Sequence, residues 1–367
     1  MCTDNTAIVS AKVRNLLGLS LRRLVQNLHP ASCDIVMATG ILAVAASIER
    51  MAFVALSLTY LNFALLITLL VANVVRFIWY PAAVVQDLRG FERGPGFFTI
   101  AAGIAIVGSQ LVTILHKPEM ARVAWVAALV LWAAFNYTIF IEITINENKP
   151  RFEDGINGGW LISVVATQAV ANLSIQISGG LGDPGWVMFL ALAMWLAGGM
   201  LYIWLIALIF YRFTFFRFRP ESFLPPFWIN MGAMAVSALT GTTLVSKAGS
   251  AAFLPGLIPF VMGLTLLYWA TATWWIPMLT VLAIWQHIIR NVNRPYSLLY
   301  WSAVFPLGMY TVATWQLARV LNVPFLQWIP RGFIYVAMAG WLSTFIAMLH
   351  SEFAHGPESH RFGRYAA

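Results

Sequence analysis

The chain has 367 residues, of which 60% are hydrophobic and only 10% are charged. Soluble domains are about half apolar and about a quarter charged, so this composition excludes a large water-soluble domain. The formal net charge is +8. The Lys and Arg residues are scattered singly in short connections and form no basic stripe, which argues against a nucleic-acid partner.

Long runs without a formal charge recur along the chain, beginning with the 25 residues between Arg50 and Arg76. A helix of about 20 apolar residues crosses the roughly 30 Å hydrocarbon core of a bilayer. The pattern predicts an all-α integral membrane protein with ten transmembrane helices. The expected spans lie near residues 30–48, 53–76, 96–115, 122–143, 156–178, 185–211, 226–246, 256–289, 297–320 and 330–350.

These spans divide the chain into three parts. Residues 1–29 are expected to be an N-terminal amphipathic cytoplasmic segment, because basic residues alternate there with Leu and Val. Residues 30–350 form the transmembrane domain, and residues 351–367 a short cytoplasmic tail. Cys2 and Cys33 form no CxxC pair, so no disulfide framework is predicted.

The distribution of basic residues predicts the orientation. Because ten is an even number, both termini lie on one side of the membrane. Placing the termini and the second, fourth, sixth and eighth connections in the cytoplasm puts 16 of the 22 Lys and Arg residues there. The positive-inside rule therefore favours a multi-pass cell-membrane protein with cytoplasmic N- and C-termini.

The odd-numbered spans carry most of the small, polar and helix-breaking residues, whereas Leu, Ile, Val, Phe and Trp dominate the even-numbered ones. Taken singly, such residues are more typical of close helix packing. Their concentration in alternate spans favours an inner ring of five odd-numbered helices around a channel. The candidate pore-lining residues are Asp34, Thr39, Gly40, Ser163, Thr167, Asn230, Ser237, Gly241, Pro306 and Gly308.

Two further positions have specific alternatives. Pro306 lies inside the ninth span, where proline kinks a helix, and Phe305 beside it is either an apolar plug or an ordinary packed side chain. Asp34 lies near the start of the first span, where a carboxylate needs water or a partner. It either caps the helix or faces a cytoplasmic vestibule, or it takes part in proton coupling or substrate contact.

Four separated stretches have a familiar pattern: HPASCDIVMATGIL (residues 29–42), NGGWLISVVATQAVANL (157–173), PPFWINMGAMAVSALTGTTL (225–244) and YWSAVFPLGMYTVATWQLA (300–318). Together they resemble the tellurite-resistance/C4-dicarboxylate transporter family, which includes plant slow anion channels, malate carriers and sulfite efflux pumps. The resemblance implies five helical hairpins around a quasi-fivefold central pore, with Phe305 as the gate. A homotrimer would fit it. Cys33 stands where the family pattern implies an aromatic residue, and Asp34 is an unusual addition.

These observations predict passage of small anions through a phenylalanine-gated pore in a lipid bilayer. Dicarboxylates such as malate and inorganic anions, including sulfite- and tellurite-type oxyanions, are candidate substrates. The alternative is a proton-coupled C4-dicarboxylate carrier. A membrane-embedded enzyme is the candidate of a different class, but His350, His355 and His360 have no HExxH motif or Cys partner, so neither a metal site nor a cofactor is expected.

Overall fold

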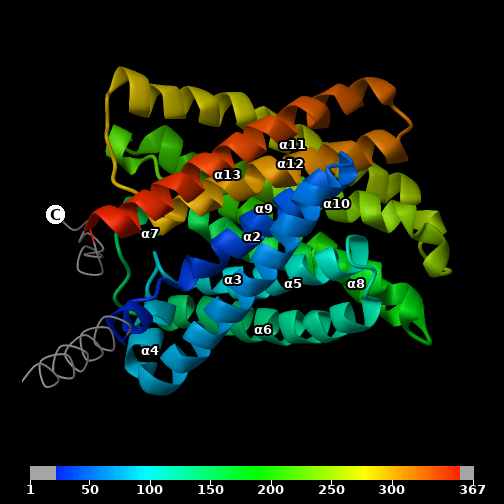
Figure 1. Cartoon of the computed structure of the whole chain (residues 1–367), viewed down its shortest axis with the longest axis horizontal. Coiled ribbons are helices and arrows are strands. Elements are labelled where there is room, and N and C mark those ends of the chain that lie inside the picture. The colour runs from blue at the N-terminus through cyan, green and yellow to red at the C-terminus, as the bar shows by residue number, and fades with distance from the viewer. Residues whose placement is uncertain (1–21, 356–367) are drawn as a thin grey trace, which may run out of the picture.

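The structure is a computed structural model that describes residues 22–355. Every regular element in this range is a helix, which confirms the all-α class. Figure 1 shows an elongated bundle, with the two described ends of the chain at the same end of it. Most of the expected N-terminal segment (residues 1–21) and most of the tail, including His360, lie outside the described residues.

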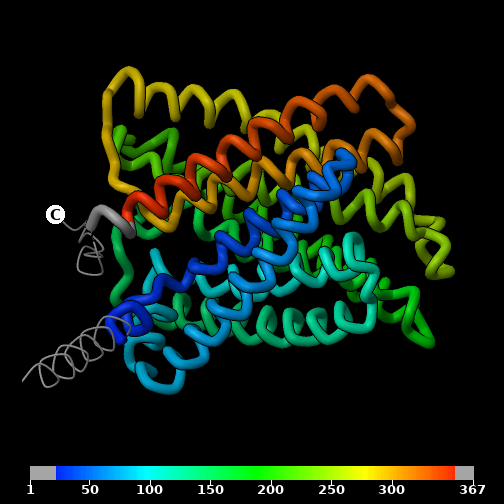
Figure 2. Tube along the Cα trace, in the orientation of Figure 1, coloured from blue at the N-terminus to red at the C-terminus, as the bar shows by residue number. Residues whose placement is uncertain are grey.

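Ten described helices have 15 or more residues, and they follow one another in pairs (Figure 2). The pairs are α2 (Asp34–Ile48) with α3 (Ala52–Trp79), α5 (Phe98–Thr113) with α6 (Pro118–Ile145), α8 (Ile162–Ile177) with α9 (Pro184–Phe215), α10 (Ile229–Ser246) with α11 (Ile258–Ile284), and α12 (Trp301–Val320) with α13 (Trp328–His355).

Within the described range, nine helical segments are long and apolar enough to cross a membrane. They coincide closely with nine of the ten expected spans. The exception is α12, whose Tyr, Thr, Pro and Gln residues make it more polar. Two short helices that were not expected, α4 (Pro81–Arg89) and α7 (Phe152–Gly155), lie in the connections after α3 and α6.

Helices α2, α5, α8, α10 and α12 form what we call the inner ring. Each contacts the next in this order, and α12 contacts α2, so the sequence of contacts closes. Burial differs between inner and outer helices in an apolar stretch of 18 residues taken from each candidate span. Between 83% and 94% of these residues are buried in the spans that contain α2, α5, α8 and α10, against 11% to 44% in the outer helices. Alternate helices of the chain therefore occupy the inside and the outside of the bundle.

A 3₁₀ turn precedes every helix of the inner ring. These turns are η1 (Pro30–Cys33), η2 (Gly94–Phe97), η3 (Gly158–Leu161), η6 (Pro225–Trp228) and η10 (Leu298–Tyr300). They contact one another in the same closed order as the helices. The inner helices therefore run parallel, and we call the end with these turns the N-terminal side of the ring.

Side-chain hydrogen bonds link each outer helix to the inner helix of the following hairpin. We call five of these bonds, one from each outer helix, latches. In four of them an outer Trp donates its indole N–H, and in the fifth an Asn donates its amide. The latches are Asn62 to Gln110 Oε1 (2.8 Å), Trp132 to Thr167 Oγ1 (2.8 Å), Trp195 to the Ser237 carbonyl (2.8 Å), Trp269 to Thr314 Oγ1 (3.0 Å) and Trp341 to Thr39 Oγ1 (3.0 Å).

Tight turns join the inner helices α2 and α12 to their outer partners. Arg50 (φ 61°) and Asn322 (φ 54°) adopt the left-handed conformation just after these helices. The next residue donates its N–H back to the helix in both cases, from Met51 to Ala46 and from Val323 to Ala318. This is the hydrogen-bond pattern that ends helices sharply, so each outer helix returns directly along its inner partner.

Candidate functional site

A central cavity of about 580 Å³ opens among the five helices of the inner ring. Most of its lining residues come from the C-terminal halves of the five helices, so it lies toward the C-terminal side of the ring. The polar lining residues are Ser47, Ser109, Thr113, Asn172, Gln176, Thr243 and Gln316. Arg50 and Lys247 also border the cavity, and each of these exposed cations is without an ion pair among residues 22–355.

The lining follows helical periodicity. On α8 it is Ala169, Asn172 and Gln176, and on α12 it includes Met309, Val312 and Gln316. Residues three and four apart lie on one face of a helix, so a single face of each inner helix is turned toward the cavity. Most side chains on these faces are small, apolar or uncharged amides, and the cations stand only at the C-terminal ends.

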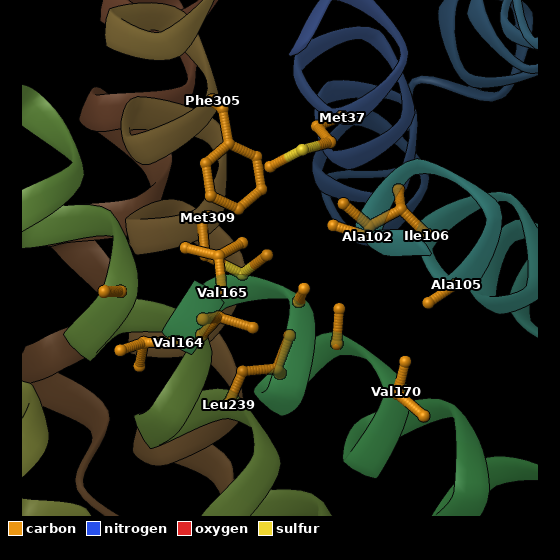
Figure 3. Close-up of a cluster of buried hydrophobic side chains, with 14 of the residues drawn as sticks. Met37, Ala102, Ala105, Ile106, Val164, Val165, Val170, Leu239, Phe305 and Met309 are labelled. Carbon is orange, nitrogen blue, oxygen red and sulfur yellow. The ribbon is translucent and has the colours of Figure 1, made fainter. Parts of the chain in front are cut away.

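Phe305 is buried on α12, on the N-terminal side of the cavity-lining residues of that helix. Its side chain is only 1% exposed, and it precedes the cavity-lining Met309 by one helical turn. Figure 3 shows the ring of Phe305 among the inner helices, with Met37 of α2 pointing toward it and Met309 and Val165 beside it. The Phe305 ring therefore lies in a cluster of buried apolar side chains from α2, α8 and α12.

Helix α10 makes room for the proline of α12. A Cβ atom at Gly232 would lie 2.7 Å from Cγ of Pro306, which is too close for any other residue at that position. Pro306 therefore packs against Gly232 of α10. Gly308 faces α2 in the same way, because a Cβ there would lie 2.9 Å from the side chain of Ile41.

None of the ten residues that we proposed from the sequence as pore-lining candidates borders the central cavity. Thr39 and Thr167 accept the latch hydrogen bonds from Trp341 and Trp132 of outer helices. Ser163 bonds the carbonyl of Trp160 within its own segment, and the α-carbon of Gly40 faces Asn62 and Ile106. These polar and small residues lie at contacts between helices.

The candidates on α10 also face outer helices. The Ser237 carbonyl accepts the latch from Trp195, and the Asn230 carbonyl accepts a hydrogen bond from Tyr202 of α9 at 3.2 Å. Gly241 leaves room for Thr265 and Trp195. A role of these residues in lining a path stays a prediction. Asp34 is the first residue of α2 and is buried.

Sequence reasoning did not single out Gln176, Gln316, Arg50 and Lys247 as lining residues. The i, i+4 spacing of Asn172 and Gln176 is a signal that could have identified the α8 face. Asn172 is 5% exposed, and its Oδ1 atom has no hydrogen-bond partner among residues 22–355. Because Asn and Gln amides can donate as well as accept, this face can bind an anion without carrying a charge.

A buried ion cluster stabilises the N-terminal side. Asp87 of α4 pairs with Arg76 (2.6 Å) and Arg93 (2.7 Å), and Arg76 also donates to the carbonyl of Gln26 at 3.1 Å. Nearby, His29 Nδ1 accepts the N–H of Ala31 and caps η1. Burial, with the positive charges of Arg93 and Arg76, lowers the pKa of His29 to about 3, so this cap stays neutral at physiological pH.

Comparison with known proteins places this architecture in a family. A family model described as "Voltage-dependent anion channel" matches residues 27–349, which include all ten long helices except the end of α13. The match therefore covers the inner ring, the outer helices and the central cavity together.

Individual relatives agree with this match. An uncharacterized transporter of Methanocaldococcus jannaschii is 24% identical over 335 residues, covering 88% of this chain and 93% of that protein. A sulfite efflux pump of Trichophyton rubrum is 21% identical over 355 residues, covering 89% of this chain and 92% of the pump. An uncharacterized membrane protein of Mycobacterium tuberculosis is 36% identical over 169 residues, 44% of this chain and 84% of its own length.

Proposed function

Because the chain belongs to the voltage-dependent anion channel family, we propose that it passes small anions across the membrane along the axis of the inner ring. One observation carries this proposal. The central cavity is lined by all five helices of a closed ring and by no outer helix. A cavity on the axis of five parallel helices, rather than between two neighbours, is the arrangement that a transmembrane path requires.

The bundle crosses the membrane ten times in this proposal, with α12 as the span that composition alone does not identify. As a member of the inner ring, α12 is shielded from lipid by α11 and α13, so it tolerates a more polar composition. The ten helices form five hairpins around a quasi-fivefold axis. The N-terminal side of the ring faces the cytoplasm, as the positive-inside rule predicts.

The chemistry of the lining suits transport better than tight binding. An anion in the cavity would meet amides and hydroxyls on the walls and the cations Arg50 and Lys247 at the rim. Weak binding at several sites lets an ion leave as readily as it enters. The substrates are therefore small anions that shed water at moderate cost, and the name of the fungal relative makes sulfite the first oxyanion to test.

Phe305 is the gate in this proposal. Its ring occupies the axis where the cavity ends, and hydrophobic constrictions of this kind close pores by excluding water as well as ions. Opening requires the ring to move away from Met37 and Met309. Both neighbours are unbranched and flexible, so they can adapt to a second position of the ring.

Flux through purified full-length protein in liposomes tests the proposal, with chloride, nitrate, sulfite, tellurite and malate as separate substrates. Phe305→Ala is expected to raise anion flux by about tenfold or more, because it removes the apolar constriction. Phe135→Ala is the matched control. Phe135 is also buried, but it lies on the outer helix α6 against Phe97, and it is expected to leave flux unchanged.

Both substitutions remove a buried ring and cost about 3 to 5 kcal/mol of stability, so thermal unfolding in detergent controls for damage to the fold. Equal flux through wild type and a folded Phe305→Ala variant would refute the gate. Absence of flux for every anion in both proteins would refute anion passage. Malate flux that always carries a fixed number of protons would indicate the coupled carrier instead.

A further inference from the structure

Asp34 is a buried carboxylate that the proposed path does not yet explain. It is the first residue of α2 and is 1% exposed. Neither of its oxygens has a hydrogen-bond partner among the described residues. The other buried carboxylate, Asp87, is held by two arginines. Buried acidic groups are normally paired with a cation or hydrogen-bonded, and Asp34 has neither kind of partner among the described residues.

Helical periodicity places Asp34 on the axis of the inner ring. Counting along α2 from Asp34 in alternate steps of three and four residues gives Met37, Ile41, Val44 and Ile48. The last three line the central cavity, and Met37 points toward Phe305 in Figure 3. At 100° per residue all five lie within an arc of about 80°. Asp34 therefore faces the axis one turn beyond the gate, on the N-terminal side.

The other titratable groups around α2 come from the elements that contact it, which are α3, α5, α12, α13, η1 and η10. Helix α5 has no titratable residue. At the N-terminal end of α2 the groups are Cys33, Arg76 and Tyr300, with His350, Glu352 and His355 at the corresponding end of α13; farther along are Tyr60, Tyr310, Arg319, Arg331 and Tyr335.

No cation in this set neutralises Asp34. Arg76 is bound to Asp87 at 2.6 Å, and Arg319 and Arg331 belong to the C-terminal side, where they cover the rings of Trp315 and Trp328. His350 is exposed at the end of α13. His29, just before η1, stays neutral because its pKa is about 3.

We propose that Asp34 is a proton-binding site that controls the path, which admits anions when the carboxyl group is protonated and repels them when it is ionised. The inference rests on the proposed function, since it requires an anion on the axis. The proton binds one carboxylate oxygen and removes a unit of negative charge next to the gate. Intramembrane carboxylates of this kind commonly bind protons in transport proteins. Passage then increases as pH falls through the titration of Asp34 and decreases as pH rises.

Nitrate flux into liposomes containing the full-length protein tests this, with the same pH on both sides, stepped from about pH 8 to about pH 5. Wild-type flux is expected to rise by roughly tenfold or more across the titration. Like charges a few ångströms apart at an effective dielectric constant of about 20 produce an effect of at least this size. Asp34→Asn, which is neutral at every pH, is expected to keep the high flux throughout.

Two control variants separate this inference from its alternatives. His350→Gln combined with His355→Gln removes both histidines of α13 and is expected to retain the wild-type pH dependence. Phe305→Ala is expected to raise flux at every pH, and this flux should still depend on pH. The double variant Phe305→Ala/Asp34→Asn is expected to show high flux that no longer depends on pH. The double variant also reports on the path if Asp34→Asn alone folds poorly.

The outcomes distinguish the two proposals. Flux that is independent of pH in wild type, or a pH dependence that persists in Asp34→Asn, would overturn the role of Asp34 and leave anion passage intact. Absence of nitrate flux from wild type and from Phe305→Ala at every pH would instead overturn the proposed function.

Discussion

The inner ring and the outer helices are built from nearly the same types of residue, but the inner helices pack against protein and the outer helices face lipid. Outer helices such as α3 turn Leu, Ile, Val, Phe and Trp toward lipid, and only a minority of their residues are buried. The inner helices are almost completely buried but carry more Gly, Ser and Thr. In a soluble protein the buried elements would be the more apolar ones. In this protein lipid accepts the apolar side chains, and the interior uses small residues to bring helices close.

The polar residues of the inner helices fall into two groups with different partners. Hydroxyls and carbonyls on one side accept the latches from outer helices, as Thr167 does from Trp132. Amides on the other side, such as Asn172 and Gln176, border the cavity. One helix therefore holds the bundle together with one polar face and offers a second polar face to a passing ion. Polar content alone does not distinguish these roles.

The largest expected difference between the two regions concerns glycine. A Cβ atom at Gly158 in η3 would collide with the backbone of Pro226 and Phe227 in η6, whereas a Cβ at Gly263 on the outer helix α11 would meet nothing within 4 Å. Gly158→Ala is expected to cost about 3 kcal/mol, because backbone cannot move aside. Gly263→Ala should be neutral or stabilising by up to about 1 kcal/mol. Thermal unfolding midpoints in detergent measure the stability of both variants. Equal midpoints would show that the contact between η3 and η6 can accommodate a side chain at position 158.

A latch should contribute less than the packing of the turns. Thr167→Val removes the acceptor of the Trp132 indole and is expected to cost about 1 kcal/mol, with anion flux unchanged. Thr271→Val is the control, since Thr271 is exposed on α11 and donates to the carbonyl of Leu267 in its own helix. It is expected to change stability by less than about 0.5 kcal/mol. A change in flux at unchanged stability would instead place Thr167 on the path.

The smallest expected effect comes from the rim of the cavity. Arg50→Asn and Lys247→Gln are expected to lower flux by roughly threefold each at low ionic strength, because they remove cations that concentrate anions at the mouth. Asn tolerates the left-handed conformation of position 50. The effect should disappear at about 1 M salt, where the screening length is about 3 Å. Lys117→Gln, on the same side but not bordering the cavity, serves as control. A loss equal to that of Arg50→Asn would mean that only overall charge matters.

Sequence alone predicted the all-α class, the boundaries of most spans and the division into alternate inner and outer helices, because each depends on local composition. The first span was expected at 30–48 and is Pro30–Ile48. The direction in which a polar residue points could not be predicted in the same way. Thr39 is turned outward by Trp341, which is 302 residues away in the chain. The resemblance to a known family, by contrast, directed attention to Phe305, which lies one helical turn before the cavity-lining Met309.

That distant latch also constrains how the molecule is made. Four of the five latches join hairpins that leave the ribosome one after the other, but the bond from Trp341 to Thr39 joins the last hairpin to the first. Until the last hairpin has been inserted, α2 has one side without its neighbours α12 and α13. The nascent protein must therefore keep its first helix available in the bilayer throughout synthesis, and a stop codon before α12 would leave an open arc of hairpins rather than a smaller ring.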